Sequence, residues 1–212
     1  MDQTPNEVTH LIDLLRAGDR HALGELFHCY RERLRRMVEL RMDARLRTRL
    51  DASDVLQEAY LDLAGDLDAY RADPKLQPLL WMRLHVGRRL TMLHRRHLGT
   101  RLRDAGLEIS LYREALPQAS SAALASMLLG RHTSPTQAAQ RAERLLRVQE
   151  ALNTLDPIDR EVLALKHFEE LSRAETAEVL GISPETAAKR YFRALKRLKE
   201  VLASMPGGWE GI

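Results

Sequence analysis

Cysteine is almost absent from this chain of 212 residues, which contains only Cys29. A single cysteine excludes an internal disulfide framework and a zinc site built from cysteines, and it fits a reducing compartment. The chain also has no window near the roughly 18 apolar residues of a membrane span, and it starts without the basic and apolar segments of a signal peptide. We therefore expect a cytoplasmic protein without a membrane-spanning segment.

Aromatic residues are scarce at 5%, and long runs of Val, Ile, Thr and Tyr are missing. Because strands are rich in these residues, the sequence favours helices over sheet. Glycine-rich phosphate-binding loops and nucleophile motifs are also missing, so we expect neither an enzyme nor a bound cofactor. The proportions of hydrophobic residues, 44%, and charged residues, 30%, are typical of a folded chain rather than a disordered one.

Apolar side chains recur at three- and four-residue steps, which is the period of an amphipathic helix. In the N-terminal half this pattern predicts helices over residues 8–17, 20–42, 51–67 and 79–98. Asp-Pro and Gln-Pro pairs predict a loop over residues 68–78. We expect an all-α protein with two small helical domains, residues 1–99 and 135–212. Residues 100–134 are the expected linker, in which SSAALASMLLG is the only apolar helical piece.

The C-terminal part carries strong signals for helix starts. Capping residues followed by proline open helices at Ser134-Pro135, Asp156-Pro157 and Ser183-Pro184. Ser172 and Glu175 form a capping box, and Gly181 closes the short helix that this box opens. Two capped helices around a glycine turn predict a helix-turn-helix over residues 171–198. An ordinary helical hairpin is the alternative.

Charge is unevenly distributed along the chain. An acidic segment carries Asp51, Asp54, Glu58, Asp62, Asp66 and Asp68. Residues 78–103 contain no acid and carry Arg83, Arg88, Arg89, Arg95, Arg96, Arg101 and Arg103. A second basic run consists of Lys189, Arg190, Arg193, Lys196, Arg197 and Lys199. This pattern indicates two DNA-facing surfaces and a separate surface for another partner, with plain solvated helix faces as the alternative.

At these residues the chain resembles a known family. Residues 159–202, DREVLALKHFEELSRAETAEVLGISPETAAKRYFRALKRLKEVL, look like the fourth conserved region of sigma-seventy family sigma factors. Residues 51–70, DASDVLQEAYLDLAGDLDAY, resemble the conserved helix of region two, whose aspartate-x-x-glutamine-glutamate core matches Asp54, Gln57 and Glu58. Trp81 and the basic helix after it resemble the next parts of region two. The two regions, separated only by a linker, are similar to the layout of the extracytoplasmic-function (ECF) group.

The resemblance implies a sigma factor that binds core RNA polymerase and directs promoter-specific transcription initiation. It implies docking on the β′ clamp helices through Asp54, Gln57, Glu58 and Asp62, and a contact of region four with the β flap. The minus-ten element of promoter DNA would meet Arg71, Lys75, Arg88, Arg89, Arg95 and Arg96. The minus-thirty-five element would meet Ser183, Glu185, Thr186, Lys189, Arg190, Arg193 and Arg197. An anti-sigma factor is a further candidate partner, which the linker helix 120–130 could bind.

Two departures from the family pattern concern promoter choice. Residues 84–89 read Leu-His-Val-Gly-Arg-Arg where the pattern has Ile-Ala-Arg-Asn, and Ala188 stands where a lysine is usual.

Other functions stay open at this point. A regulator could use the helix-turn-helix without joining the polymerase, although a plain repressor has no need of the acidic helix. A metal-dependent nuclease could use the carboxylates of Asp62, Asp66, Asp68 and Asp73. His94 and His97 could ligate a metal, but no further ligand lies near them in sequence. Trp81 leads an apolar stripe, so we expect it in the core rather than on a base-stacking surface.

Overall fold

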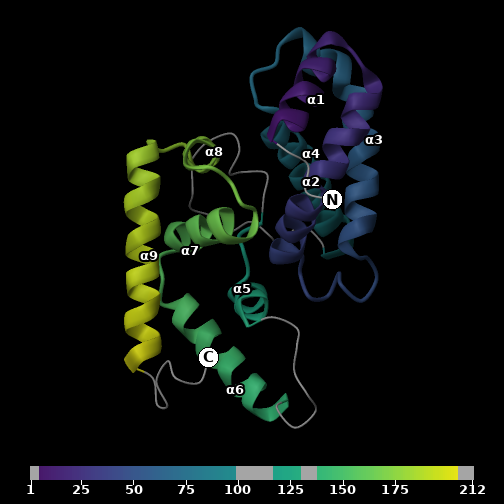
Figure 1. Cartoon of the computed structure of the whole chain (residues 1–212). Helices are drawn as coiled ribbons and strands as arrows, with labels where there is room; N and C mark the ends of the chain where they lie inside the picture. The colour runs from purple at the N-terminus through teal and green to yellow at the C-terminus, as the bar shows by residue number, and fades with distance from the viewer. Residues whose placement is uncertain (1–4, 99–116, 130–137, 205–212) are drawn as a thin grey trace. The chain divides into compact units, whose positions relative to one another are not determined.

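A computed structural model describes residues 5–98, 117–129 and 138–204. The regular elements in these ranges are all helices, which confirms the predicted all-α class (Figure 1). They are α1 (Pro5–Ala17), α2 (Arg20–Arg41), α3 (Ala52–Ala72), α4 (Pro78–Leu98), α5 (Ser121–Leu128), α6 (Ala138–Asn153), α7 (Pro157–Leu163), η2 (Ala164–Phe168), α8 (Arg173–Leu180) and α9 (Pro184–Ser204). The chain divides into two compact units, Met1–Leu116 and Pro117–Ile212.

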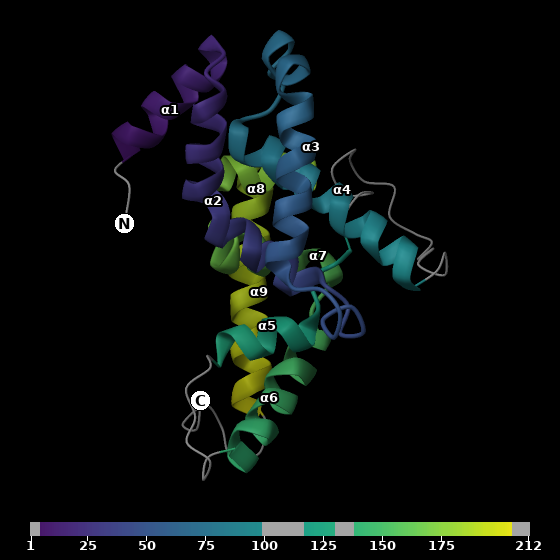
Figure 2. The same ribbon diagram turned by 90° about the vertical axis from the view of Figure 1, so that its right-hand side faces the viewer.

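The first unit is a bundle of α1 to α4, in which α2 packs against the other three helices and α3 packs against α4 (Figure 2). The predicted apolar stripes meet in its interior. Leu26 of α2 and Leu63 of α3 are fully buried, as is Leu90 of α4. Burying a leucine side chain stabilises a fold by about 1.5–3 kcal/mol, so these stripes hold the bundle together.

The corner between α1 and α2 depends on Gly18, whose φ of 105° lies in the left-handed region. Its N–H donates to Leu15 O at 3.1 Å, and the Asp19 N–H donates to Leu14 O at 3.0 Å, which together close α1. Asp19 then caps α2, as predicted, by accepting from the His21 N–H. A Cβ on Gly18 would lie 2.6 Å from Arg71 Nη2, so this side chain also fills the corner.

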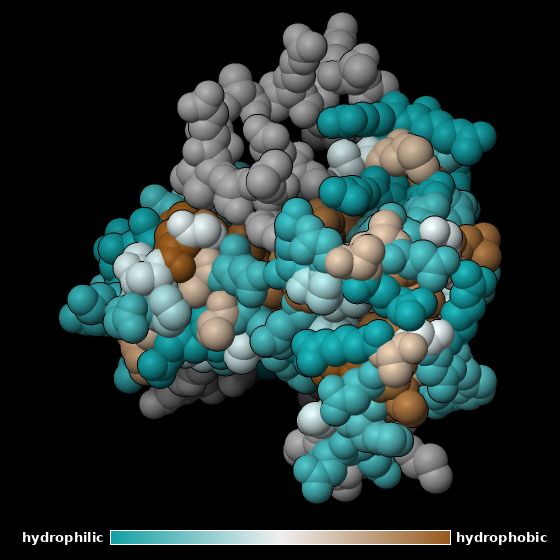
Figure 3. Space-filling view, turned by 90° about the horizontal axis from the view of Figure 1, so that it is seen from above, coloured by the Kyte–Doolittle hydropathy of each residue, from teal (hydrophilic) through white to brown (hydrophobic). Residues whose placement is uncertain are grey.

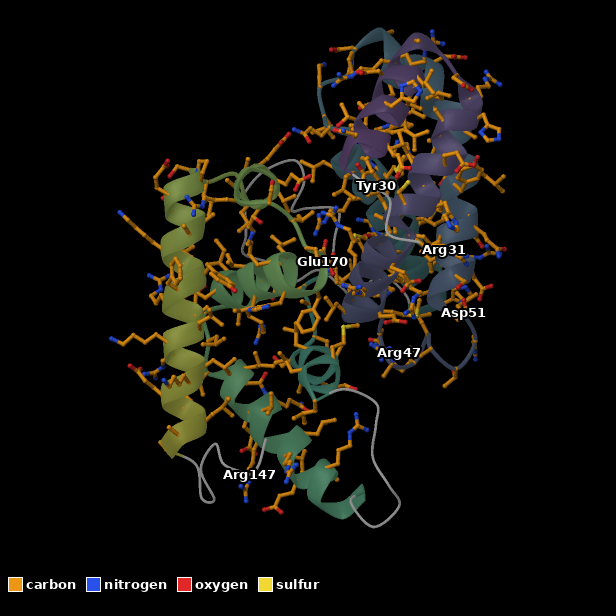
Figure 4. The ribbon with its side chains drawn as sticks, viewed as in Figure 1. Tyr30, Arg31, Arg47, Asp51, Arg147 and Glu170 are labelled. Carbon is orange, nitrogen blue, oxygen red and sulfur yellow. The ribbon has the colours of Figure 1, made fainter. Side chains whose placement is uncertain are left out.

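The turn between α2 and α3 is fixed by side chains at both of its ends (Figure 4). Arg47 donates from its guanidinium to the carbonyl oxygens of Glu39 and Met42, which lie at the C-terminal end of α2. Asp51 caps α3 by accepting from the N–H groups of Ser53 and Asp54. The two helices therefore leave the turn in a defined direction.

The loop between α3 and α4 is shorter than the predicted 68–78, because α3 continues to Ala72. Tyr70 is buried and stacks on Trp81, with ring centroids 4.1 Å apart. The Tyr70 hydroxyl donates to Leu76 O at 2.7 Å and ties the loop to this pair. Trp81 is only 4% exposed, which confirms its predicted place in the core.

The second unit contains α5 to α9. Helix α9 packs against α6, α7 and α8, and α5 packs against α6. Side-chain bonds also join the start of α5 to α7: Arg160 donates to Ser121 Oγ, and Glu161 accepts from the Ala119 N–H. Residues 117–129, expected in the linker, therefore pack with the second unit. The predicted end at Gly99 and the predicted cap at Ser134-Pro135 lie outside the described residues.

Helices α8 and α9 form the predicted helix-turn-helix. Ser172 and Glu175 make the predicted capping box at the start of α8. Gly181 ends α8 with a φ of 64°, and the Ile182 N–H donates to Ala177 O, so the turn is a Schellman motif. Ser183 starts α9 by accepting from the Thr186 N–H at 3.2 Å. No pattern in the sequence predicted the π-helix η2, which precedes α8.

A left-handed residue follows η2. Glu170 has a φ of 54° and lies between η2 and α8 (Figure 4). Lys166 of η2 donates to Leu171 O at 2.7 Å and bridges the same turn.

Candidate functional site

The outer face of α9 is an exposed, mainly cationic helix surface. Glu185, Lys189 and Lys196 are exposed along it, whereas Ala187 and Ala194 are buried on the opposite side. Phe192 lies among these charges with 66% of its surface exposed. The sequence analysis did not predict Phe192 as a contact residue. Its position three residues after Lys189 and off the apolar stripe could have indicated an exposed ring. Charged side chains and an apolar ring are the groups that meet phosphates and base edges in a DNA groove.

Two predicted DNA-contact residues of α9 also form bonds within the protein. Arg190 Nη1 donates to Asp159 Oδ1 at 2.8 Å, and Arg193 donates to both carboxylate oxygens of the same residue. Asp159 belongs to the first turn of α7 and is 5% exposed. Burial alone would raise the pKa of Asp159, but the hydrogen bonds from Arg193 and Arg190 outweigh it and lower this pKa.

The remaining predicted residues of α9 have different surroundings. Ser183 is used as the cap, and its Oγ also lies 3.0 Å from Thr186 Oγ1. The pKa of the Glu185 carboxyl is lowered mainly by a hydrogen bond from the backbone N–H of Glu185 itself. A hydrogen bond from the Ser183 side chain lowers it further. Arg197 is exposed further along the helix.

The predicted docking residues of α3 divide into two groups. Gln57 is exposed and free to meet a partner, and beside it lies Leu61, which is 72% exposed. Asp54 accepts from the Asp51 N–H at 2.8 Å and so takes part in the helix cap. Glu58 and Asp62 accept from a guanidinium of α4. The sequence analysis did not predict Leu61 as a contact residue. Its position off the apolar stripe of this helix was the signal that could have indicated an exposed leucine.

That guanidinium belongs to Arg89, which was predicted to contact the minus-ten element. Its Nε donates to Asp62 Oδ2 at 2.9 Å and its Nη1 to Glu58 Oε2 at 3.4 Å, and its Nη2 also pairs with Asp62. Arg89 therefore points from α4 toward the acidic face of α3 and links the two helices.

Other members of the basic stretch are turned inward as well. Arg83 and His85 are buried, and His85 Nε2 lies 3.1 Å from Asp66 Oδ2. Burial lowers the pKa of His85 more than the neighbouring Asp66 raises it. The arginines that α4 exposes are Arg88, Arg95 and Arg96, so these three stay candidates for the predicted minus-ten contact.

The loop side of the predicted minus-ten surface carries compensated charges. Arg71 packs against Gly18 and pairs with Asp68 at 3.4 Å. Lys75 pairs with Asp73 at 2.8 Å. Both cations stay exposed, and exposed pairs of this kind contribute only about 0–1 kcal/mol, so DNA phosphates can compete for them.

The proposed nuclease carboxylates do not gather at one point. Asp62 pairs with Arg89, Asp66 with His85, and Asp68 with Arg20. Within the described ranges, no group of three or more His, Cys, Asp and Glu side chains is arranged to hold a metal ion. His94 is buried, and its Nε2 accepts from the Asp43 N–H at 3.4 Å, which is a structural contact. His97 is exposed. The described residues therefore give no support to a metal-dependent nuclease or to a metal site at His94 and His97.

The surface seen in Figure 3 is mostly hydrophilic, with hydrophobic side chains in small separate patches. None of the helices in the part of the chain that the structure describes is both long and apolar enough to cross a membrane.

A helix-turn-helix whose second helix exposes a cationic face defines a DNA-binding transcription protein. The family profile described as Sigma-70, region 4, matches residues 145–198. The chain is 30% identical over 190 residues to the ECF RNA polymerase sigma factor SigD of Mycobacterium tuberculosis, a match covering 89% of this chain and 80% of SigD. It is 31% identical over 174 residues to the RNA polymerase sigma-E factor of Streptomyces avermitilis, covering 79% of this chain and 83% of that protein.

The fold is also similar to a solved structure, that of CnrH in complex with the cytosolic domain of CnrY. The TM-score is 0.53 at 21% identity, and the match covers 93% of this chain and 97% of CnrH. The chain belongs to the ECF group of the sigma-70 family of RNA polymerase sigma factors. It therefore acts with RNA polymerase on promoter DNA and directs transcription initiation, and a regulator that never joins the polymerase is not favoured.

Proposed function

We propose that each step of initiation uses its own helix of this sigma factor. The outer face of α3 docks on the β′ clamp helices of core polymerase, α4 contacts the minus-ten element, α9 reads the minus-thirty-five element, and the second unit meets the β flap. The observation that carries this division is the segregation of charge. Helix α3 contains five acids and only Arg71 as a base, whereas α4 contains five arginines and no acid. Opposite charges attract each helix to a different partner.

The structure changes which residues of α3 are suited to a docking test. Asp54 belongs to the helix cap, and Glu58 and Asp62 hold Arg89, so substituting them would disturb the fold as well as the surface. Gln57 and Leu61 are exposed one helical turn apart. They form the part of this face that a partner can bury without breaking an internal bond.

We expect Gln57→Lys with Leu61→Lys to weaken binding to core RNA polymerase by about tenfold or more, which corresponds to about 1.4 kcal/mol. Two lysines would repel a basic docking surface and remove the apolar contact of Leu61. Binding is measured by fluorescence anisotropy of the labelled full chain with core polymerase. Run-off transcription from a genomic promoter pool should fall in parallel.

His10→Lys with Ala17→Lys is the matched control, because it adds two lysines at exposed positions of α1. This control should bind and transcribe like the wild-type chain. Wild-type affinity of the α3 variant for core polymerase would show that the docking assignment is wrong.

An anti-sigma factor is a further proposed partner. The support is that a protein of similar fold, CnrH, was solved in complex with the cytosolic domain of CnrY. In the second unit, Leu128 at the end of α5 and Leu146 of α6 remain 46% and 58% exposed. Apolar side chains of this kind are the groups that a protein partner covers.

A further inference from the structure

Asp159 is a buried carboxylate that no step of the proposed function uses directly. It lies in α7, outside the DNA-facing helix, and its side chain is only 7% exposed. It accepts from Arg190 Nη1 at 2.8 Å, from Arg193 Nε at 2.9 Å and from Arg193 Nη2 at 2.8 Å. One buried anion therefore binds two cations of the proposed recognition helix.

The two arginines are held in different ways. The Arg193 guanidinium uses one full edge, Nε and Nη2, for Asp159, yet 60% of its side chain remains exposed. Its Nη1 is thus left to meet a ligand, and the two-point contact fixes the plane of the group. Arg190 is 27% exposed and makes a single bond, which ties α9 to α7.

We propose that Asp159 is a positioning residue for promoter recognition, which orients Arg193 toward a phosphate of the minus-thirty-five DNA and fixes α9 against α7 through Arg190. This inference rests on the proposed function of α9. Binding a flexible arginine to DNA costs side-chain entropy, and a guanidinium that is already oriented loses less of it.

The inference predicts a result opposite in sign to simple electrostatics. Removing an acid near a DNA-binding helix should strengthen binding, because a repulsion of phosphates is lost. If Asp159 positions Arg193, removing its charge should weaken binding instead. Asp156 offers a matched control in the same turn. It caps α7 by accepting from the Ile158 N–H at 2.9 Å, a bond that asparagine can also make, and it acts on Arg193 through the attraction of charge without a hydrogen bond.

The test uses the full chain assembled with core polymerase. Two probes are used: the duplex most enriched by the wild-type holoenzyme from a randomised minus-thirty-five library, and a scrambled duplex of equal length. We expect Asp159→Asn to weaken binding to the enriched duplex by about tenfold and to reduce the salt slope by about one, the loss of one phosphate contact. Binding to the scrambled duplex should weaken as well, because a phosphate contact carries no sequence information. Asp156→Asn should bind both duplexes at least as tightly as the wild-type chain.

A double-mutant cycle separates positioning from a general weakening of the fold. If Asp159 acts mainly through Arg193, Asp159→Asn combined with Arg193→Ala should lose clearly less affinity than the sum of the two single losses, the remainder being the bond to Arg190. Asp159→Glu keeps the charge and should recover part of the lost affinity. Circular dichroism melting of each variant establishes that it is folded at the binding temperature.

The outcomes are distinguishable. Wild-type binding of the enriched duplex by Asp159→Asn, or a loss that adds in full to that of Arg193→Ala, would overturn the positioning role. Failure of the wild-type holoenzyme to enrich any sequence would instead overturn the proposed function of α9.

Discussion

At the scale of single residues, buried histidines couple the stability of the first unit to pH. His94 is 3% exposed and joins α4 to the turn after α2 through the Asp43 N–H. Burial lowers the pKa of His94, and the attraction of Asp43 only partly opposes this. An imidazole in the unfolded chain titrates at about pH 6.5. Between that value and the lower folded pKa, the unfolded state binds more protons, so stability falls as pH drops.

We therefore expect the first unit to lose stability between about pH 7.5 and 5.5, and His94→Gln to lose less over that interval. His85, whose pKa burial also lowers, keeps part of the pH dependence in the variant. The measurement is urea unfolding followed by the fluorescence of Trp81, with Trp209→Phe as the background that removes the second tryptophan. The same substitution at exposed His97 is the control. An equal pH dependence of the wild-type chain and His94→Gln would contradict the assignment.

At the scale of elements, we expect the proposed recognition helix α9 to make two kinds of DNA contact along its length. Lys189 lies nearer the capped N-terminus of α9, where recognition helices reach base edges, and Arg197 lies two turns further on. We expect Lys189→Ala to cost about 1–3 kcal/mol and to relax specificity at one base pair. Arg197→Ala should weaken all sequences alike and reduce the salt slope by about one. The measurement is holoenzyme binding to a randomised minus-thirty-five library at several salt concentrations.

The reverse pattern would show that α9 enters the groove in the other direction. In that case Lys189→Ala would weaken every sequence equally, and Arg197→Ala would shift the preferred sequence.

At the scale of the whole molecule, each of the two units carries one of the two proposed DNA-binding surfaces. Arg88 is exposed on α4 in the first unit, and Lys189 is exposed on α9 in the second. Substitutions without shared partners usually add within about 0.3–0.5 kcal/mol. We expect the effects of Arg88→Ala and Lys189→Ala on holoenzyme affinity for a complete promoter to be additive within that range. A coupling larger than about 1 kcal/mol would contradict separate recognition by the two units.

Local sequence signals predicted most of the helices because their causes are local. The Asp19 cap, the capping box of Ser172 and Glu175, and the left-handed Gly181 each depend on residues within one turn of chain. The amphipathic stripes likewise give the buried face of each helix directly. The helix-turn-helix and the all-α class follow from these short-range rules alone.

Partners far apart in sequence were decided only by the tertiary structure. Arg89 is 27 residues from Asp62, and Arg193 is 34 residues from Asp159, so no periodicity could pair them. The sequence determined that α4 and α9 are cationic helices. Packing determined which of their arginines form ion pairs within the protein, because only the fold brings a guanidinium beside a carboxylate that is distant in sequence.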